Sequence, residues 1–169
     1  DEKNGQGTTT WSAPHPSAGE KHTGEYKNDK KNGQGTTTWS APHPGAGQQH
    51  VGGYKNDLRN GQGFYVWKNG RADFCLYTDD EDSNCSGTNV YDVALNLTEK
   101  FRQMPESQRK KIQSNLKLNG FYTSVVDGKW GRGTFTALAS HAALKLKTVN
   151  INTASSANNL LQSVLGTNL

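Results

Sequence analysis

The chain has 169 residues, 31% of them hydrophobic, and a net charge of +4 at pH 7. A chain of this length forms one domain or two small ones, and its mean hydropathy of −0.87 leaves material for only a thin core. No apolar run approaches the length of a membrane-spanning helix, which excludes such a helix within these residues. The sequence begins inside a repeat, so the lack of a leader peptide carries no information.

The charge is unevenly distributed along the chain. Residues 1–70 hold eight basic and six acidic side chains, residues 71–100 hold two and seven, and residues 101–169 hold nine and two. The basic C-terminal part favours an anionic polymer as a partner. Nucleic acid and a cell-wall polymer with free carboxylates fit this charge equally well, and so does a solvated helix face without a partner.

The first 70 residues are a repeat. Residues 1–28 and 29–56 are two copies of one sequence that differ at six positions, and a third, shorter copy runs from Asp57 to about Gly70. A fixed period of 28 residues predicts an array in which each unit buries its face on its neighbours. We expect further copies before residue 1, which the mass or the full gene of the natural protein would test.

Each copy has the composition of β-strands. Residues 33–39 are rich in β-branched and aromatic side chains, and asparagine-rich segments at 28–32 and 56–60 supply turns. A spacing of Tyr-x6-Gly-x-Gly-x3-Trp occurs twice, at Tyr26, Gly33, Gly35 and Trp39 and again at Tyr54, Gly61, Gly63 and Trp67. This spacing resembles the MORN repeat.

The resemblance implies successive β-hairpins, and roles in lipid-surface binding, dimerisation or spacing. The copies exceed the usual MORN length through proline-containing segments at 12–23 and 40–51, which we predict to be two long loops. The regular aromatic positions are typical of a core. Because no polybasic run or basic amphipathic helix is present, we favour a structural spacer or interaction array over a lipid binder.

Histidines recur with the same period as the aromatic residues, at His15, His22, His43 and His50. No cysteine or carboxylate accompanies them in every copy, so a metal site is disfavoured. We predict that all four are solvent-exposed loop residues.

The segment after the repeats is acidic and carries both cysteines. Residues 72–77 are predicted to be the last strand, following a hairpin turn at 68–71. The acidic cluster at 79–82 lacks the spacing of an EF-hand, so we predict a solvated loop. We predict a disulfide between Cys75 and Cys85 in an oxidising compartment, with two unpaired thiols as the alternative, since two cysteines alone cannot complete a zinc site.

The C-terminal part has the pattern of a small helical domain. Helices are predicted at 105–118, after Thr134, and from about Ser155 to Gly166. The residues that carry a family resemblance are Ile112, Gln113, Leu116, Gly120, Phe121 or Tyr122, Asp127, Gly128, Trp130, Gly131, Thr134 and Ala137. Their spacing resembles the peptidoglycan-binding-like domain of bacterial cell-wall enzymes.

That second resemblance implies a three-helix domain with a shallow groove for peptidoglycan stem peptide or glycan. The residues that it implies for ligand binding are Phe121, Tyr122, Asp127, Gly128, Lys129 and Trp130. Exposed aromatic rings give flat contact area, and the N–H groups of a turn can meet a carboxylate. Structural roles in the turn, the core and the helix cap are the alternative for the same residues.

The sequence therefore predicts an α+β protein. A MORN-like antiparallel β-hairpin meander spans 1–78, an acidic linker spans 79–92, and a three-helix domain spans 93–169. We find no Ser-His-Asp or metal-binding motif, and we predict a non-catalytic protein without a metal or cofactor.

The predicted function is peptidoglycan binding in the periplasm or on the surface of a bacterium. The β array would then be a spacer, a surface for a protein partner, or a site of self-association, and no nucleic acid is expected. One alternative is a protein- or lipid-interaction scaffold in which the array binds and the helical domain is only structural. Another is a targeting fragment of a larger cell-wall hydrolase.

Overall fold

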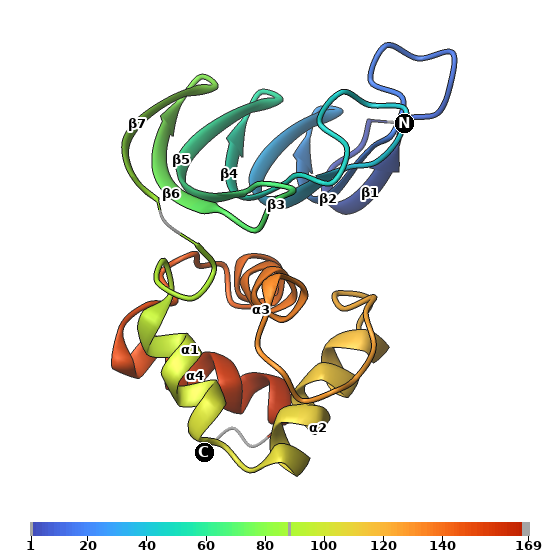
Figure 1. Ribbon diagram of the computed structural model, residues 1–169. Helices are drawn as coiled ribbons and strands as arrows, with labels where there is room; N and C mark the ends of the chain where they lie inside the picture. Colours follow the sequence, from blue (N-terminus) through green and yellow to red (C-terminus); the bar gives the residue numbers. More distant parts are fainter. Residues whose placement is uncertain (1, 88, 167–169) are drawn as a thin grey trace. The chain divides into compact units, whose positions relative to one another are not determined.

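The computed structural model describes residues 2–87 and 89–166 (Figure 1). It separates into two compact units, with the division between residues 88 and 89. We call residues 2–87 the sheet unit and residues 89–166 the helical unit. The predicted α+β class is confirmed.

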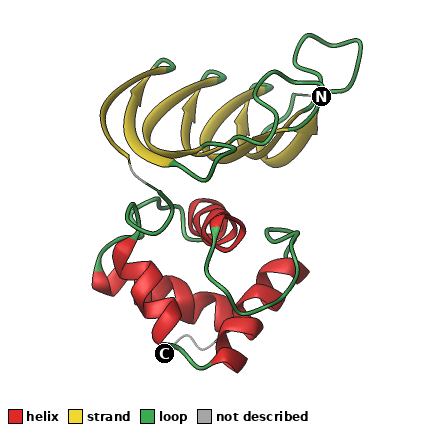
Figure 2. Cartoon of the chain, viewed as in Figure 1, coloured by secondary structure: helices red, strands yellow, loops and turns green. Residues whose placement is uncertain are grey.

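The sheet unit is a single antiparallel meander in which every strand pairs with its neighbours in the chain (Figure 2). Its strands within the described residues are β1 (Gly5–Thr10), β2 (Glu20–Lys27), β3 (Lys30–Trp39), β4 (Gln49–Lys55), β5 (Leu58–Val66), β6 (Ala72–Thr78) and β7 (Glu81–Gly87). Register aligns Thr37, His50 and Tyr65 across β3, β4 and β5. Since side chains alternate between faces along a strand, these polar and aromatic residues share one face.

Three tight turns each connect the two strands of one hairpin, and each is hydrogen-bonded to the repeat before it. Both central residues of each turn have positive φ, as type I′ turns require, at Asn28-Asp29, Asn56-Asp57 and Asp79-Asp80. The second residue of each turn accepts a 2.8 Å hydrogen bond from a backbone N–H of the preceding hairpin, at Lys3, Lys31 and Arg59. The sequence repeat thus produces the same aspartate-to-backbone hydrogen bond between each pair of neighbouring repeats.

The structure corrects the prediction of a loop at 79–92, because residues 81–87 pair with β6 as strand β7. Tyr77 and the turn that follows it correspond, in the next repeat, to Tyr54 and the turn that follows Tyr54. The interval between these two tyrosines is 23 residues instead of 28, because the connection between β5 and β6 is short. Asn84 takes the place of a repeat glycine and has a positive φ of 49°. The 28-residue period therefore does not predict this last hairpin.

The two cysteines form the predicted disulfide. Cys75 on β6 is bonded to Cys85 on β7, with their Cα atoms 4.2 Å apart. The bond joins the last two strands of the meander covalently. It lies at the end of the sheet where the repeat sequence has diverged most.

The helical unit has four helices among its described residues, and the prediction of three was one short. They are α1 (Leu95–Gln103), α2 (Glu106–Leu118), α3 (Arg132–Lys145) and α4 (Ala154–Leu165). The extra helix is α1, which buries Leu97 and Phe101. As predicted, α4 ends at Gly166, where φ is 74°. None of the helices in the described parts of the chain is long and apolar enough to cross a membrane.

Candidate binding site

Two of the four repeat histidines are core residues of the sheet unit. His22 on β2 and His50 on β4 have no exposed surface, which contradicts the prediction that they lie in solvent-exposed loops. The proline-containing loops end at residues 19 and 48, so both histidines fall on strands. His15 does lie exposed in its loop, and His43 is half-buried in the equivalent loop.

The repeat glycines make room for the two buried imidazoles. Gly24 and Gly35 are paired across β2 and β3, and the ring of His22 lies against both. A Cβ at Gly35 would stand 2.4 Å from Cε1 of His22, and one at Gly63 would stand 2.6 Å from Nε2 of His50. At these positions glycine is required by close approach of a side chain to the backbone.

The imidazoles alternate with tyrosine rings in a row that we call the ladder, in the order Tyr26, His22, Tyr54, His50 and Tyr77. Each neighbouring pair meets edge to face, with centroids 4.7–5.4 Å apart. Such T-shaped contacts are the preferred geometry of aromatic pairs. The predicted core role of the periodic aromatic residues is therefore confirmed for the tyrosines but not for the tryptophans, because Trp11, Trp39 and Trp67 are not fully buried.

Hydrogen bonds join the central members of the ladder. Nδ1 of His22 lies 2.8 Å from the hydroxyl of Thr37, which lies 2.6 Å from the Tyr54 hydroxyl. The Tyr54 hydroxyl lies 2.9 Å from Nδ1 of His50. One continuous polar chain thus crosses three strands inside the sheet unit.

The ladder is uncharged at neutral pH. Burial, with smaller contributions from Lys31 and Lys3, lowers the pKa of His22 to about 3. Burial likewise places the pKa of His50 well below its usual value and raises the pKa of Tyr54. Desolvation disfavours the charged form of each group, so these side chains serve as packing elements.

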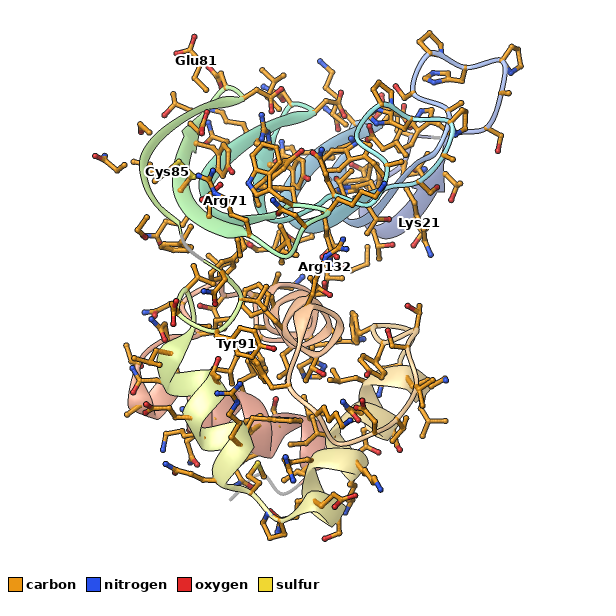
Figure 3. The ribbon with its side chains drawn as sticks, viewed as in Figure 1. Lys21, Arg71, Glu81, Cys85, Tyr91 and Arg132 are labelled. Atoms are coloured by element: carbon orange, nitrogen blue, oxygen red, sulfur yellow. A yellow bond between two sulfur atoms is a disulfide. The ribbon has the colours of Figure 1, made fainter. Side chains whose placement is uncertain are left out.

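A hollow of about 390 Å³ opens on the polar, aromatic face of the sheet unit, and we call it the trough. Its lining residues are Glu20, Lys31, Thr37, Trp39, His43, Gly45, Tyr54, Asp57, Arg59, Tyr65 and Asp80. Thr37 and Tyr54 of the polar chain form part of its floor. Figure 3 shows the side chains of the sheet unit crowded within the bend of its strands.

Half-exposed aromatic rings lie in and beside the trough. The centroids of Trp39 and Tyr65 are 5.9 Å apart, and those of Tyr65 and Trp67 are 4.8 Å apart. His43 stacks on Trp39 at 5.9 Å with an interplanar angle of 30°. Its Nδ1 accepts a 3.0 Å hydrogen bond from the N–H of Gly45, which fixes the ring. The long loop between β3 and β4 therefore builds one wall of the trough.

The charged groups of the trough are paired with one another. Lys31 forms an ion pair with Glu20, and Nε of Arg59 lies 3.0 Å from Oδ1 of Asp80. Asp57 accepts its hydrogen bond from the backbone of Lys31. Two cations thus face three carboxylates, and the net charge of the lining is small and negative.

In the helical unit, Gln113 on α2 organises the loop that carries most of the predicted ligand residues. Its Oε1 accepts from the N–H groups of Asp127 (2.9 Å) and Gly128 (2.7 Å). Its Nε2 lies 3.2 Å from Oδ1 of Asp127, 3.0 Å from the carbonyl of Lys129 and 3.1 Å from the hydroxyl of Thr134. The buried side-chain amide of Gln113 therefore provides hydrogen-bond partners for the backbone groups of the turn. Hydrogen bonds from Lys129 N–H and Gln113 lower the pKa of Asp127.

We predict that Gln113→Ala destabilises the helical unit by roughly 3 kcal/mol, because it leaves buried backbone groups of the turn without partners. Amide hydrogen exchange of helical-unit residues in the full chain measures this change. Gln108→Ala, an exposed position on the same helix, is the matched control and should change stability by less than about 0.5 kcal/mol. Equal effects of the two variants would show that the hydrogen bonds of Gln113 are not important.

The predicted ligand residues divide into a buried and an accessible group. Tyr122 and Trp130 are only 6% and 7% exposed, and Gly128 is buried as well. Trp130 packs on Phe101 with centroids 5.4 Å apart. The accessible group is Phe121, Asp127 and Lys129. The structure thus brings residues 127–130 together, but it uses several of them as the support of the turn.

Sequence reasoning did not find the trough, although two signals for it were present. Lys3, Lys31 and Arg59 recur at one position of the repeat, and each places its cation over a tyrosine ring of the ladder. The histidine of each long loop recurs four residues after a tryptophan. Only the fold shows that strand and loop residues face one hollow.

A model of the MORN repeat matches residues 1–13, 22–41 and 50–70. The sheet unit contains MORN repeats. The matched segments stop before β6 and β7, which continue the MORN sheet in the structure. MORN repeats suggest a protein that interacts with membranes or with other proteins. A search of curated proteins found no match.

Proposed function

We propose that this protein is a non-catalytic interaction protein whose MORN sheet binds a partner in the trough. The observation that carries this proposal is the half-exposed aromatic surface of Trp39 and Tyr65, in a sheet whose ladder tyrosines are buried. Concave sites of roughly 300–1,000 Å³ with aromatic walls and a few polar groups are typical of ligand binding. The trough, at about 390 Å³, lies in this range.

The charge of the MORN sheet favours a molecular partner over an anionic membrane surface. Residues 2–87 hold nine basic and ten acidic side chains. Attraction to anionic lipids requires a cluster of basic groups, each contributing about 1 kcal/mol near the surface. The acidic and basic groups of the trough are paired, which supports binding rather than acid–base catalysis.

We place the protein outside the cytoplasm, in the periplasm or at the cell surface. The disulfide between Cys75 and Cys85 supports this location, because disulfides persist in oxidising compartments. The measurement is the redox state of the cysteines in protein trapped directly from cells. Reduced cysteines in the natural location would contradict the proposal.

Photo-cross-linking tests the binding role of the trough. A photoreactive amino acid is placed at His43, on the trough wall, or at Lys21, an exposed residue of the opposite face that Figure 3 labels. We expect a discrete adduct from position 43 in extracts of the source cells, reduced about tenfold by Trp39→Ala, since aromatic anchors dominate binding energy. An adduct that forms equally from both positions, or that Trp39→Ala leaves unchanged, would contradict a binding role.

A second candidate function, peptidoglycan binding by the helical unit, rests on its charge and its accessible loop residues. Residues 89–166 hold ten basic and four acidic side chains, and Phe121, Asp127 and Lys129 are accessible. The test is co-sedimentation of the full chain with insoluble peptidoglycan at low and high salt. Salt-resistant pelleting that Phe121→Ala abolishes and Trp39→Ala does not would support this candidate. Pelleting that salt removes reflects charge attraction alone.

A further inference from the structure

The trough combines flat aromatic surface with two ion pairs and one further carboxylate, that of Asp57. Trp39 and Tyr65 supply the aromatic surface, and the ion pairs of Lys31 and Arg59 supply polar groups of both kinds. A lysine ammonium has three N–H donors and an arginine guanidinium has five, whereas each carboxylate has several lone pairs. These paired groups therefore keep donors and acceptors beyond those used in the pair.

This charge balance discriminates between classes of ligand. A phosphate or carboxylate ligand would compete with Glu20 and Asp80 for the cations, and a cationic ligand would compete with Lys31 and Arg59 for the carboxylates. Either exchange at these two pairs breaks an existing ion pair and leaves one charge without its partner, and an anionic ligand would also face the carboxylate of Asp57. A neutral ligand with many hydroxyl groups avoids this cost, because a hydroxyl both donates and accepts.

The aromatic rings favour the same class. A pyranose ring has a hydrophobic face of C–H groups and a rim of hydroxyls, and an aromatic ring with a polar edge matches both parts. Nε1 of Trp39 donates a 3.2 Å hydrogen bond to Oε2 of Glu20, which places a carboxylate at the edge of the indole ring. His43 stacks on Trp39 and lines the trough beside it. Polar groups thus stand at the rim of a flat hydrophobic surface.

We propose that the trough is a saccharide-binding site for a neutral chain of β-1,4-linked sugars, in which Trp39 and Tyr65 stack on sugar faces and the Lys31–Glu20 and Arg59–Asp80 pairs bind hydroxyls. We favour the β-1,4 linkage because the substituents of such sugars are equatorial, which leaves both faces of each ring flat enough to stack on an aromatic side chain. This proposal rests on the proposed binding role of the trough. It adds the chemical class of the ligand.

Calorimetric titration of the full chain with chitotetraose and cellotetraose tests this proposal. We expect saturable binding of at least one tetrasaccharide and a loss of about tenfold or more in affinity for Trp39→Ala, consistent with loss of an aromatic anchor. Leu76→Ala, which removes an exposed apolar side chain of β6 outside the trough, is the matched control and should leave the affinity unchanged, and Phe121→Ala reports on the helical unit. Circular dichroism of each variant checks that the sheet is folded.

Three outcomes would overturn the saccharide proposal: no saturable binding of either sugar, equal affinity in Trp39→Ala, or loss of binding in Phe121→Ala alone. The photo-cross-linking result separates these outcomes from failure of the proposed function. If the adduct at position 43 depends on Trp39 while both tetrasaccharides fail to bind, the trough binds a partner of another class. If the adduct is independent of Trp39 as well, the trough is not a binding site.

Discussion

Gly35→Ala is expected to destabilise the MORN sheet by roughly 3 kcal/mol, the upper range for an overpacked core. The added methyl group would stand 2.4 Å from Cε1 and 2.7 Å from Nε2 of His22. The imidazole cannot move away easily, because it is fully buried and lies between the rings of Tyr26 and Tyr54. Urea unfolding of the full chain, followed by tryptophan fluorescence, measures the loss.

Gly7→Ala is the matched control for this prediction. Gly7 occupies the same position of the repeat, but the nearest atom to its added methyl group is Cδ2 of Tyr26 at 3.4 Å, an ordinary contact. We expect a change of less than about 1 kcal/mol. A similar loss in both variants would show that glycine is needed for backbone reasons common to all copies, and that the histidine contact is unimportant.

Acidification from pH 7.5 to pH 5.0 is expected to destabilise the MORN sheet by about 4 kcal/mol through His22 and His50 together. The pKa of His22 is about 3 in the folded protein, and that of His50 is also far below normal. Below about pH 6.5 the unfolded chain binds a proton at each histidine and the folded chain does not. The stabilisation is therefore present above pH 6.5 and is lost as the pH falls below it, by about 1.4 kcal/mol per pH unit for each histidine, and the contribution of His22 continues to fall until about pH 3.

The free energy of unfolding, measured in urea at several pH values, gives this slope directly. His50→Gln removes one of the two titrating groups, so we expect the slope between pH 6.0 and 5.0 to fall by about 1.4 kcal/mol per pH unit. The variant will be less stable at every pH, and the slope is the informative quantity. A slope that is the same in the variant and the wild type would mean that His50 is protonated in the folded state.

Much of the sheet could be predicted from local sequence, because its hairpins depend on local rules. The Asn-Asp turns and the β-branched strands stand at fixed repeat positions, and the structure places them as predicted. The last hairpin, β6–β7, was missed because Asp79-Asp80 was interpreted as part of an acidic cluster. Its turn has the same geometry as Asn56-Asp57, but a shorter connection shifts it out of the 28-residue period.

The histidines show why the candidate site could not be predicted in the same way. His22 and His50 follow proline-containing segments, and polarity alone favours solvent for them. Their burial depends on glycines of the neighbouring strand, Gly35 and Gly63, and on the tyrosine rings on either side. Such contacts across strands depend on register, which local sequence does not supply.

The turn of the helical unit shows a different limit of sequence reasoning. The spacing of Asp127, Gly128 and Trp130 correctly indicated a turn that leads into a helix. The same residue types at this spacing suit both ligand binding and structural support of the turn, so the sequence does not distinguish these two roles. The structure adds that Gln113 satisfies this turn from inside. Whether the accessible residues Phe121 and Lys129 bind a ligand stays a prediction.

We propose that the MORN sheet, and not the helical unit, binds the ligand. The chain has four tryptophans, three in the sheet unit at positions 11, 39 and 67 and one in the helical unit at 130. The indole N–H signals of a ¹⁵N-labelled full chain, followed during a chitotetraose titration, therefore report on both units at once. We predict a saturable shift of the Trp39 signal, with Trp130 unchanged. A shift confined to Trp130 would contradict this proposal and would show that the helical unit binds the sugar.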